Sequence, residues 1–262
     1  MDLGLKDKAV LVTAASKGLG KAAALEFARQ GARVGICARS EVLEATADEI
    51  RRTTGAEVLA VRADLTKAED VQRLVAATTD RFGALDILLA NCGGPPPGGF
   101  LSLQPEDWEA GFRLIVMSVV YLCLSAIPQM LKQAAGSIVV SESYSVKQPI
   151  PNLVLSNSLR LAVIGLVKSL AEELGPKGIR VNSINPSWVW TERVQQIMAD
   201  RAERNQTSVE EESAKIRREI PLGRMGSVEE YARAAVWLAS PAASFVHGHA
   251  LMLDGGTVRA TL

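Results

Sequence analysis

Short apolar runs alternate with longer amphipathic segments along almost the whole chain. The runs are apolar on both faces, as in ILLA at residues 87–90, whereas the longer segments repeat their apolar residues at helical spacing. Strands of this kind that alternate with helices are typical of a parallel sheet covered on both sides. We therefore predict an α/β fold with one doubly wound parallel sheet of about seven strands and helices on both faces.

The order of these segments predicts a single domain over residues 1–262. Strands are expected at about residues 9–13, 33–37, 57–61, 86–90, 137–140, 179–184 and 250–253. Helices are expected after the first glycine-containing turn and at about residues 41–53, 68–82, 105–133, 152–174 and 228–239. The charged segment 191–220 has only weak apolar periodicity, and we expect it to form helices over one edge of the sheet.

The composition of the chain limits the kinds of partner that we expect it to bind. The 262 residues are 48% hydrophobic and carry a formal net charge of zero, so bulk electrostatics favour neither a nucleic-acid nor a membrane partner. The three cysteines are scattered without metal-ligand spacing, so we expect small buried residues in a reducing compartment and no metal. The first strand begins near residue 8, and no apolar run approaches membrane-spanning length. These features predict a cytoplasmic protein.

The first strand leads into a turn of small residues with the sequence TAASKGLG at positions 13–20, and an alanine-rich helix follows directly. Free backbone N–H groups and the helix dipole at such a helix start favour an anion. Gly18 and Gly20 remove side chains that would keep a pyrophosphate or a neighbouring strand away. The turn therefore predicts a nucleotide-phosphate site, and the alternative is an ordinary glycine-containing turn between a strand and a helix.

Loops after the next strands carry further candidate cofactor contacts. The second strand is followed by Ala38-Arg39-Ser40, without the acidic residue that would hold a ribose 2′-hydroxyl. Arg39 and Lys17 can instead bind a 2′-phosphate, unless both are solvated surface cations. Asp64 either caps the following helix or accepts a hydrogen bond from an adenine amino group. Small residues at 90–94 allow close approach to a ligand, or they form a simple turn.

In these motifs the chain resembles the short-chain dehydrogenase/reductase family, in particular its 3-oxoacyl-carrier-protein reductases. Thr13–Gly20 resembles the family's Thr-Gly-x-x-x-Gly-x-Gly loop, and Asp64-Leu65 resembles its adenine-contacting pair. Residues 90–93, ANCG, resemble the Asn-Asn-Ala-Gly motif. Residues 182–191, NSINPSWVWT, resemble the Pro-Gly loop with its nicotinamide-contacting threonine, and residues 253–256, LDGG, resemble the terminal Asp-Gly-Gly. The five motifs follow in family order.

The resemblance implies a Rossmann-type fold with segment 191–220 as a substrate lid, and it implies the residues that contact the cofactor. Ala14 and Ser187 stand where the family usually has glycine. The implied cofactor contacts are Thr13, Ala15, Ser16, Lys17, Gly18, Leu19, Gly20, Arg39, Asp64, Leu65, Asn91, Cys92, Gly93, Arg160, Pro186, Val189 and Thr191.

The catalytic positions depart from the family pattern. The family uses a serine, a tyrosine thirteen residues later and a lysine four beyond that. Ser143 fits the serine position, but the same spacing reaches Ser156 and Arg160. The asparagine position, seven residues beyond Trp108, is occupied by Ile115. This chain is therefore a divergent member in which Ser156 and Arg160 replace the Tyr-x-x-x-Lys pair.

Elementary chemistry limits what the replacements can do. Arg160 can hold ribose hydroxyls and keep positive charge beside a nicotinamide, but a guanidinium stays protonated and cannot relay a proton. A serine hydroxyl is a far weaker acid than a phenol. Tyr144, adjacent to Ser143 and close to Lys147, is either a substitute proton donor or a wall of the substrate pocket. Ser143, Tyr144, Ser156 and Arg160 are the candidate catalytic residues.

Other conspicuous side chains have structural interpretations. Trp188 and Trp190 flank the expected nicotinamide loop and are predicted to line an apolar pocket or pack the lid. His247 and His249 are far in sequence from any proposed acid and are predicted to lie at the surface or an interface.

Two function classes follow. The first is an NAD(P)(H)-dependent oxidoreductase that acts on a small carbonyl or alcohol substrate and prefers NADP(H) to NAD(H), with a nonstandard proton donor. The second is a catalytically inactive dinucleotide-binding protein that serves as a sensor or assembly subunit. The helices at about 105–133 and 152–174 are apolar around much of their circumference, which predicts pairing with a second copy in a homodimer or homotetramer.

Overall fold

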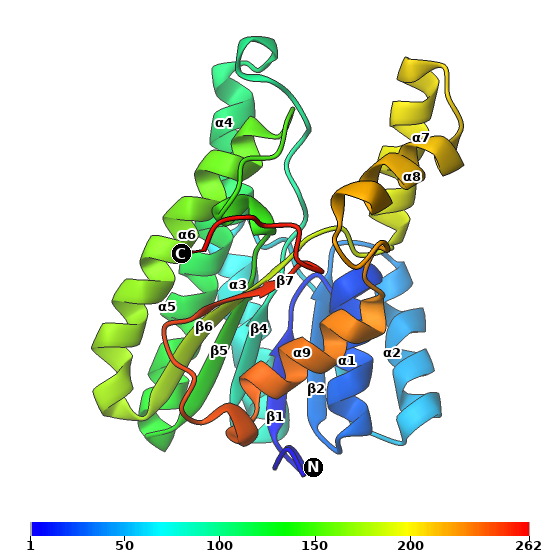
Figure 1. The fold of residues 1–262 in the computed structure, drawn as a ribbon. Helices are drawn as coiled ribbons and strands as arrows, with labels where there is room; N and C mark the ends of the chain where they lie inside the picture. The colour runs from blue at the N-terminus through cyan, green and yellow to red at the C-terminus, as the bar shows by residue number, and fades with distance from the viewer. Residues whose placement is uncertain (1, 262) are drawn as a thin grey trace.

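The computed structural model describes residues 2–261, and these form one sheet of seven parallel strands (Figure 1). The strands lie in the order β3-β2-β1-β4-β5-β6-β7. Their bounds are β1 Ala9–Val12, β2 Arg33–Ala38, β3 Val58–Arg62, β4 Ile87–Ala90, β5 Gly136–Ser141, β6 Ile179–Pro186 and β7 Ala250–Leu253. The direction in which strands are added reverses between β1 and β4, so a ligand crevice is expected beyond the carboxyl ends of these two strands. The predicted fold class is confirmed.

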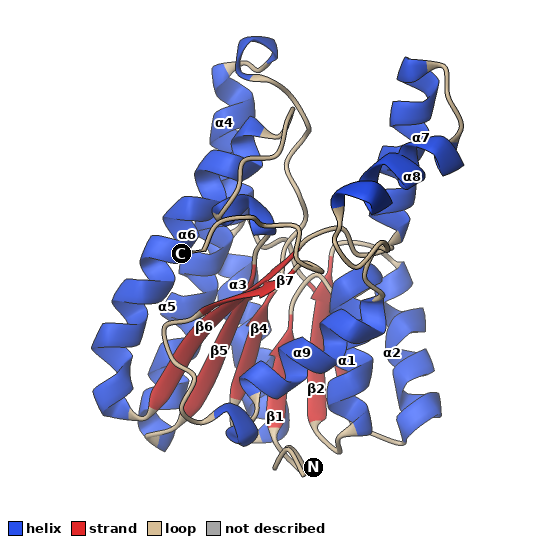
Figure 2. Cartoon of the chain, viewed as in Figure 1, coloured by secondary structure: helices blue, strands red, loops and turns tan. Residues whose placement is uncertain are grey.

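Helices cover both faces of this sheet (Figure 2). One face is covered by α1 (Gly18–Arg29), α2 (Val42–Thr54) and α9 (Val228–Ala239). The other is covered by α3 (Ala68–Phe82), α5 (Ser118–Gln133) and α6 (Val154–Leu174). The remaining helices are α4 (Pro105–Phe112), α7 (Glu192–Asn205) and α8 (Val209–Glu219).

The predicted boundaries need small corrections. The third strand begins at Val58 and ends at Arg62, and the helix expected from residue 152 begins at Val154. The helix expected over residues 105–133 is interrupted by a π-helical turn at Arg113–Met117. A π-helical turn inserts one extra residue into the helix, and apolar spacing alone does not reveal it.

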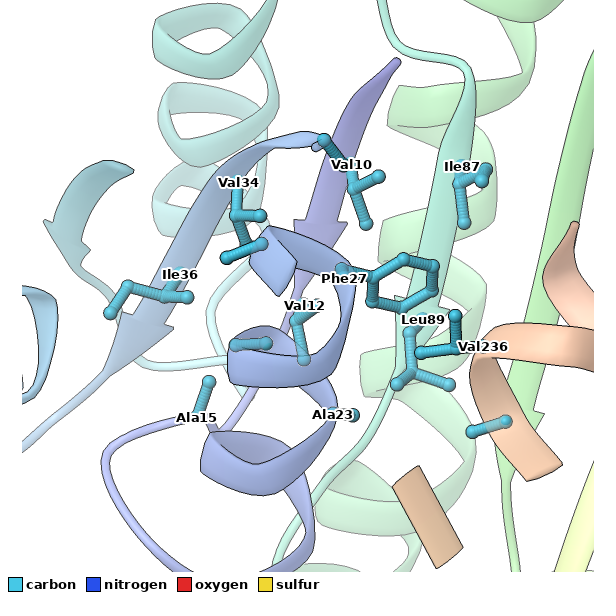
Figure 3. Close-up of a cluster of buried hydrophobic side chains, with 14 of the residues drawn as sticks. Val10, Val12, Ala15, Ala23, Phe27, Val34, Ile36, Ile87, Leu89 and Val236 are labelled. Carbon is cyan, nitrogen blue, oxygen red and sulfur yellow. The ribbon is translucent and has the colours of Figure 1, made fainter. Parts of the chain in front are cut away.

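The side chains of each central strand enter two cores. Val10 and Val12 of β1 point toward α1 and α9, whereas Leu11 between them belongs to the core on the α3–α5 side. In Figure 3 the ring of Phe27, from α1, is directed toward Leu89 and Val236. Because both faces of the sheet are buried, its central strands β1 and β4 are apolar without interruption.

The predicted lid segment forms α7 and α8. Thr191 and Ser208 begin these helices as side-chain N-caps, with hydrogen bonds to the backbone N–H groups of Val194 and Glu211. In Figure 1 the two helices stand beyond the carboxyl ends of the strands, on the other side of the opening from α4. The end of this segment reaches an edge of the sheet, because the Ile220 side chain lies 2.7 Å from the place that a Cβ atom on Gly255, shortly after edge strand β7, would occupy.

Two helical stretches leave apolar surface uncovered. Pro105–Gln133 and Val154–Lys177 are long and apolar enough to cross a membrane by length and composition, which corrects the expectation that no apolar run approaches that length. Both pack against the sheet with one face, yet less than half of each apolar window, 44% and 33%, is buried. Leu124 and Leu161 are 68% and 52% exposed, so the excess apolar surface is real.

Candidate active site

The turn between β1 and α1 has the backbone shape of an anion cradle. Ala14 and Gly18 have φ angles of +48° and +57°, and no side chain caps the start of α1. A Cβ atom on Gly20 would lie 2.4 Å from the carbonyl oxygen of Ala14, so only glycine fits there. The backbone N–H groups at the start of α1 thus face the crevice without a capping side chain, which suits a phosphate.

The loop after β4 is fastened to this turn. The hydroxyl of Thr13 donates to the carbonyl oxygen of Asn91 at 2.6 Å and accepts from its backbone N–H at 2.8 Å. The side-chain amide of Asn91 donates to the carbonyl oxygen of Ala14 at 3.3 Å. The structure thus brings together the residues on both sides of the reversal between β1 and β4.

Exposed cations surround the β2 side of the crevice. Arg39 is exposed directly after β2, and Lys17 lies in the glycine turn, where its Nζ is 3.4 Å from a carboxylate oxygen of Glu192. Arg62, which the sequence analysis missed, donates to the carbonyl oxygen of Arg39 at 3.1 Å. Its position was accessible from the pattern, because a residue at the end of β3 pairs in register with Ala38 at the end of β2.

Asp64 does not cap the helix after it. Its Oδ1 accepts hydrogen bonds from the backbone N–H of Thr66 at 3.0 Å and from the Thr66 hydroxyl at 2.8 Å. The N-cap of α3 is Lys67, so the capping alternative is wrong. Leu65 is buried in the core on the α3 side.

The remaining predicted cofactor residues lie after β6, in the glycine turn, at the start of α1 and in the loop after β4. Pro186 ends β6, and Val189 forms an isolated bridge with Gly226. The Thr191 side chain lies 3.8 Å from the place that a Cβ atom on Gly18 would occupy. Ala15, Ser16 and Leu19 belong to the glycine turn, and Gly93 is exposed with open space around it.

Ser143 begins the short helical turn Tyr144–Val146 that follows β5. Its Oγ accepts the backbone N–H of Ser145 at 3.2 Å, and no acceptor among residues 2–261 takes its own proton. The side chain is half-buried at the carboxyl end of β5. Ser143 can therefore donate a hydrogen bond to a ligand oxygen in the crevice.

Arg160 forms a buried ion pair that the sequence analysis did not predict. Its Nη1 lies 2.8 Å from Oε2 of Glu142, and the two side chains are 9% and 0% exposed. Its Nε donates to Oγ of Ser156 at 3.4 Å, and the guanidinium lies near the thiol of Cys92. The expected positive charge at this position is thus compensated by Glu142. An acidic residue directly before Ser143, at the end of a buried strand, was the signal that could have found it.

Burial is the main cause of the pKa shifts of Glu142 and Cys92. Desolvation raises the pKa of Glu142, and the neighbouring Arg160 opposes that rise. Desolvation also raises the pKa of the Cys92 thiol to about 11. Both effects follow from the cost of placing a charge in surroundings that water does not reach.

Tyr144 and the tryptophans lie at the base of α7 and α8. Tyr144 is 7% exposed, and its hydroxyl lies near the side chain of Trp188. Desolvation raises the pKa of this phenol, which makes it a weaker acid. Trp188 packs with Met198 and other apolar residues of these helices, which agrees with the packing alternative predicted for it. Trp190 is 42% exposed.

Three further predictions can be compared with the structure. Ile115 is fully buried in the core on the α5 side. Both histidines are exposed, as expected, and His247 also bonds the backbone N–H of Val181 and the carbonyl oxygen of Ala171. Cys37 and Cys123 are buried and Cys92 is half-buried, all three as free thiols. Within residues 2–261 no group of three or more His, Cys, Asp or Glu side chains could hold a metal ion.

Comparison with known proteins identifies the class of fold and site. Residues 13–258 match the family model described as enoyl-(acyl carrier protein) reductase. The 3-oxoacyl-[acyl-carrier-protein] reductase of Synechocystis sp. is 33% identical over 258 residues, which cover 97% of this chain and 98% of that protein. The chain belongs to the short-chain dehydrogenase/reductase family of oxidoreductases.

Two solved structures are informative for the site. The L-sorbose reductase of Gluconobacter frateurii, complexed with NADPH and L-sorbose, is 30% identical, with a TM-score of 0.95 over 99% of this chain and 100% of that chain. A short-chain oxidoreductase of Pseudomonas aeruginosa PAO1 that contains an atypical catalytic center is 32% identical, with a TM-score of 0.91 over 98% and 99% of the chains. These likenesses support a nicotinamide dinucleotide as the cofactor.

Proposed function

We propose that this protein is an NADP(H)-dependent oxidoreductase that interconverts a carbonyl and an alcohol on a small organic substrate. The observation that carries the proposal is the joined pair of loops after β1 and β4, in which Thr13 and Asn91 lock an anion cradle onto the loop that leads toward Ser143 and Arg160. A protein without a dinucleotide has no evident need for this arrangement. We further propose that α7 and α8 form the substrate lid of a single domain.

Preference for NADP(H) rests on the cations near the end of β2. Arg39 and Lys17, with Arg62 beside them, would make charge-assisted hydrogen bonds to a 2′-phosphate. Glu192 lies within ion-pair distance of Lys17, so Lys17 must be shared between this carboxylate and a phosphate. Arg39 is therefore the principal determinant in our proposal.

The nicotinamide, when bound, supplies or accepts the hydride. The part left to the protein is to hold the substrate oxygen and manage its proton. Ser143 would hold that oxygen, because its hydroxyl proton has no acceptor among residues 2–261. Ser156 lies against Arg160 and replaces a tyrosine only as a spacer, while Tyr144 forms a wall of the pocket beneath the lid. The proton is then exchanged with water at the substrate oxygen.

We also propose that the protein is a soluble, cytoplasmic homodimer or homotetramer. The exposed apolar residues on α5 and α6, among them Leu124 and Leu161, provide a face that a second copy would cover. Light scattering at micromolar concentration should give a mass of at least two chains. A monomeric mass would contradict this assignment.

The proposed activity has a direct test. Oxidation of NADPH is followed at 340 nm across a panel of small ketones and aldehydes, together with a separate titration of NADPH binding. Turnover of one class of carbonyl substrate is the expected result. Tight binding without turnover on any carbonyl or alcohol would favour the inactive dinucleotide-binding protein, and absence of binding would contradict both.

A further inference from the structure

Among residues 2–261, the ion pair between Glu142 and Arg160 is a strongly buried charge arrangement that the proposed reaction does not use. Glu142 directly follows β5 on the α6 side of the sheet, and Oε2 of its carboxylate is 2.8 Å from Nη1 of Arg160. Its other oxygen, Oε1, is buried and has no hydrogen-bond partner among the described residues. The register of β5 with β6 places Glu142 beside Asn185, whose buried Oδ1 likewise has no partner there. A carboxylate held this way depends on Arg160 for its compensation.

A continuous set of contacts connects this pair to the cofactor crevice. The glycine turn at Ala14 accepts a hydrogen bond from Asn91. The next residue, Cys92, lies near Arg160, whose charge opposes the rise that burial causes in the pKa of the Cys92 thiol, and Arg160 in turn pairs with Glu142. In a doubly wound sheet the two halves of a dinucleotide lie on either side of the strand reversal. Since the cations at β2 mark the adenosine half, the pair at β5 lies under the nicotinamide half.

We propose that Glu142 is a positioning residue that fixes the Arg160 guanidinium and, by neutralising it, sets the relative affinity of the site for the oxidised and the reduced nicotinamide. This inference rests on the proposed function, because it requires a nicotinamide cofactor. It goes beyond that function because it assigns a role to Glu142, and none of the family motifs described above gives Glu142 a role.

The electrostatic reason lies in the cofactor's own charge. The oxidised nicotinamide ring is positively charged and the reduced ring is neutral. An uncompensated Arg160 would repel the oxidised ring, whereas the neutral pair treats both rings alike. With an effective permittivity near 20, a unit charge at about 12 Å still changes an equilibrium roughly tenfold.

The same reasoning predicts the direction of a pH effect. The titratable or charged groups that face Glu142 are Arg160 from α6, Cys92 after β4 and Tyr231 from α9. Arg160 stays protonated, and burial raises the pKa of both Cys92 and Tyr231, so these two stay neutral near pH 7. Burial raises the pKa of Glu142, so Glu142 is the member that gains a proton as the pH falls. Its protonation leaves Arg160 unpaired and weakens binding of the oxidised cofactor.

The experiment measures Kd for NADP⁺ and for NADPH separately, by calorimetric titration of the intact protein. The ratio of the two constants is compared among the wild type, Glu142→Gln, Arg160→Gln and the double variant. Taking this ratio cancels the ionisation of the 2′-phosphate, which the two cofactors share. The control is Asp86→Asn, which breaks the ion pair with Lys8 at the opposite ends of the strands.

The expected ratios move in opposite directions. Glu142→Gln should disfavour NADP⁺ relative to NADPH by roughly tenfold, Arg160→Gln should favour it, and the double variant should return close to the wild-type ratio. Lowering the pH should shift the ratio measured for the wild type toward the ratio measured for Glu142→Gln. The ratio for Glu142→Gln itself should not change with pH. Asp86→Asn should leave the ratio unchanged.

The outcomes that would contradict the role of Glu142 can be distinguished from those that would contradict the proposed function. Thermal melting and circular dichroism identify a variant that fails to fold, in which case the double variant and the wild-type pH dependence carry the test. Binding of both cofactors with one ratio in all four proteins would overturn the role of Glu142 while leaving the proposed function intact. Failure of the folded wild type to bind either cofactor would overturn the proposed function itself.

Discussion

The two halves of the crevice differ in the kind of polar groups that they contain and in how far water reaches these groups. The half at β1–β3 consists of a backbone turn and exposed cations, with Gly20 and Arg39 as its central residues. The half at β4–β6 contains Ser143 above a buried ion pair between Glu142 and Arg160. The first half binds through groups that already face water, and the second holds charges that water does not reach. Substitutions in the first should therefore alter affinity, whereas those in the second should alter stability first.

The largest effect is expected from separating the buried pair. Arg160→Met should lower the free energy of unfolding by about 3–5 kcal/mol, because it leaves Glu142 without its counter-ion. The Glu142→Met/Arg160→Met double variant should recover most of that loss, since both charges are removed together. Urea unfolding of the three proteins measures this difference. An equal loss of unfolding free energy in Arg160→Met and in the double variant would contradict the view that an unpaired buried charge causes the loss.

That single variant should also respond to pH in a defined direction. Burial raises the pKa of Glu142 in the folded state, so its contribution favours folding while it is protonated. In Arg160→Met the stability should therefore fall as pH rises through the folded-state pKa and recover on acidification. A loss that is the same at every pH would show that Glu142 is not the group left uncompensated.

The next effect concerns the glycine turn. Gly20→Ala places a Cβ atom 2.4 Å from the Ala14 carbonyl oxygen, so the turn must shift and NADPH binding should weaken by about 1–3 kcal/mol. Gly165→Ala is the matched control, because its Cβ atom meets nothing within 4 Å in the middle of α6. The control should leave NADPH affinity unchanged. Unchanged affinity in Gly20→Ala would remove the turn from the cofactor site.

Arg39 provides a comparable but more selective effect. Arg39→Asp should weaken NADPH by about 1.5–3 kcal/mol and leave NADH nearly unaffected, because only NADPH has the 2′-phosphate. The effect should shrink as salt is added, since Arg39 is exposed. Arg52→Asp, an exposed charge reversal on α2, serves as the control in the same fluorescence titration. Equal affinities of the wild type for both cofactors would refute the assignment.

The smallest effects are expected at the two side chains that replace the family's acid. Tyr144→Phe removes only the hydroxyl near Trp188, and Ser156→Ala removes a weak 3.4 Å contact to Arg160. Turnover should change far less than the roughly 10²–10⁴-fold associated with losing a general acid. A large drop in turnover for Tyr144→Phe, with unchanged NADPH affinity, would instead identify Tyr144 as the proton donor.

The sequence predicted the sheet well because its strands are buried on both faces. Continuous apolar runs such as Ile87–Ala90 have no competing interpretation once helices separate them. The β1–β3 half was also accessible, since glycine spacing reports backbone geometry directly. Arg62 was not predicted because the expected third strand ended at residue 61, one residue short of the position that pairs with Ala38.

The β4–β6 half was less accessible for a physical reason. The pairing of Glu142 with Arg160 joins residues 18 positions apart through the packing of α6 on β5, and no local pattern encodes that contact. A charged residue at the end of a buried strand gives a hint, but its partner depends on how helix and sheet pack. The π-helical turn at Arg113–Met117 was hidden likewise, because both flanking helices keep ordinary apolar spacing.

The packing of α1 against α9 has a consequence for how the chain is made. Phe27 of α1 shares a core with Tyr231 and Val236 of α9, elements from opposite ends of the sequence. A nascent chain that has left the ribosome only through β6 therefore carries α1 with part of its apolar face bare. The apolar face of α1 is fully covered only after α9, which ends at Ala239, has left the ribosome. Until then, this face of α1 needs shielding from other unfinished chains.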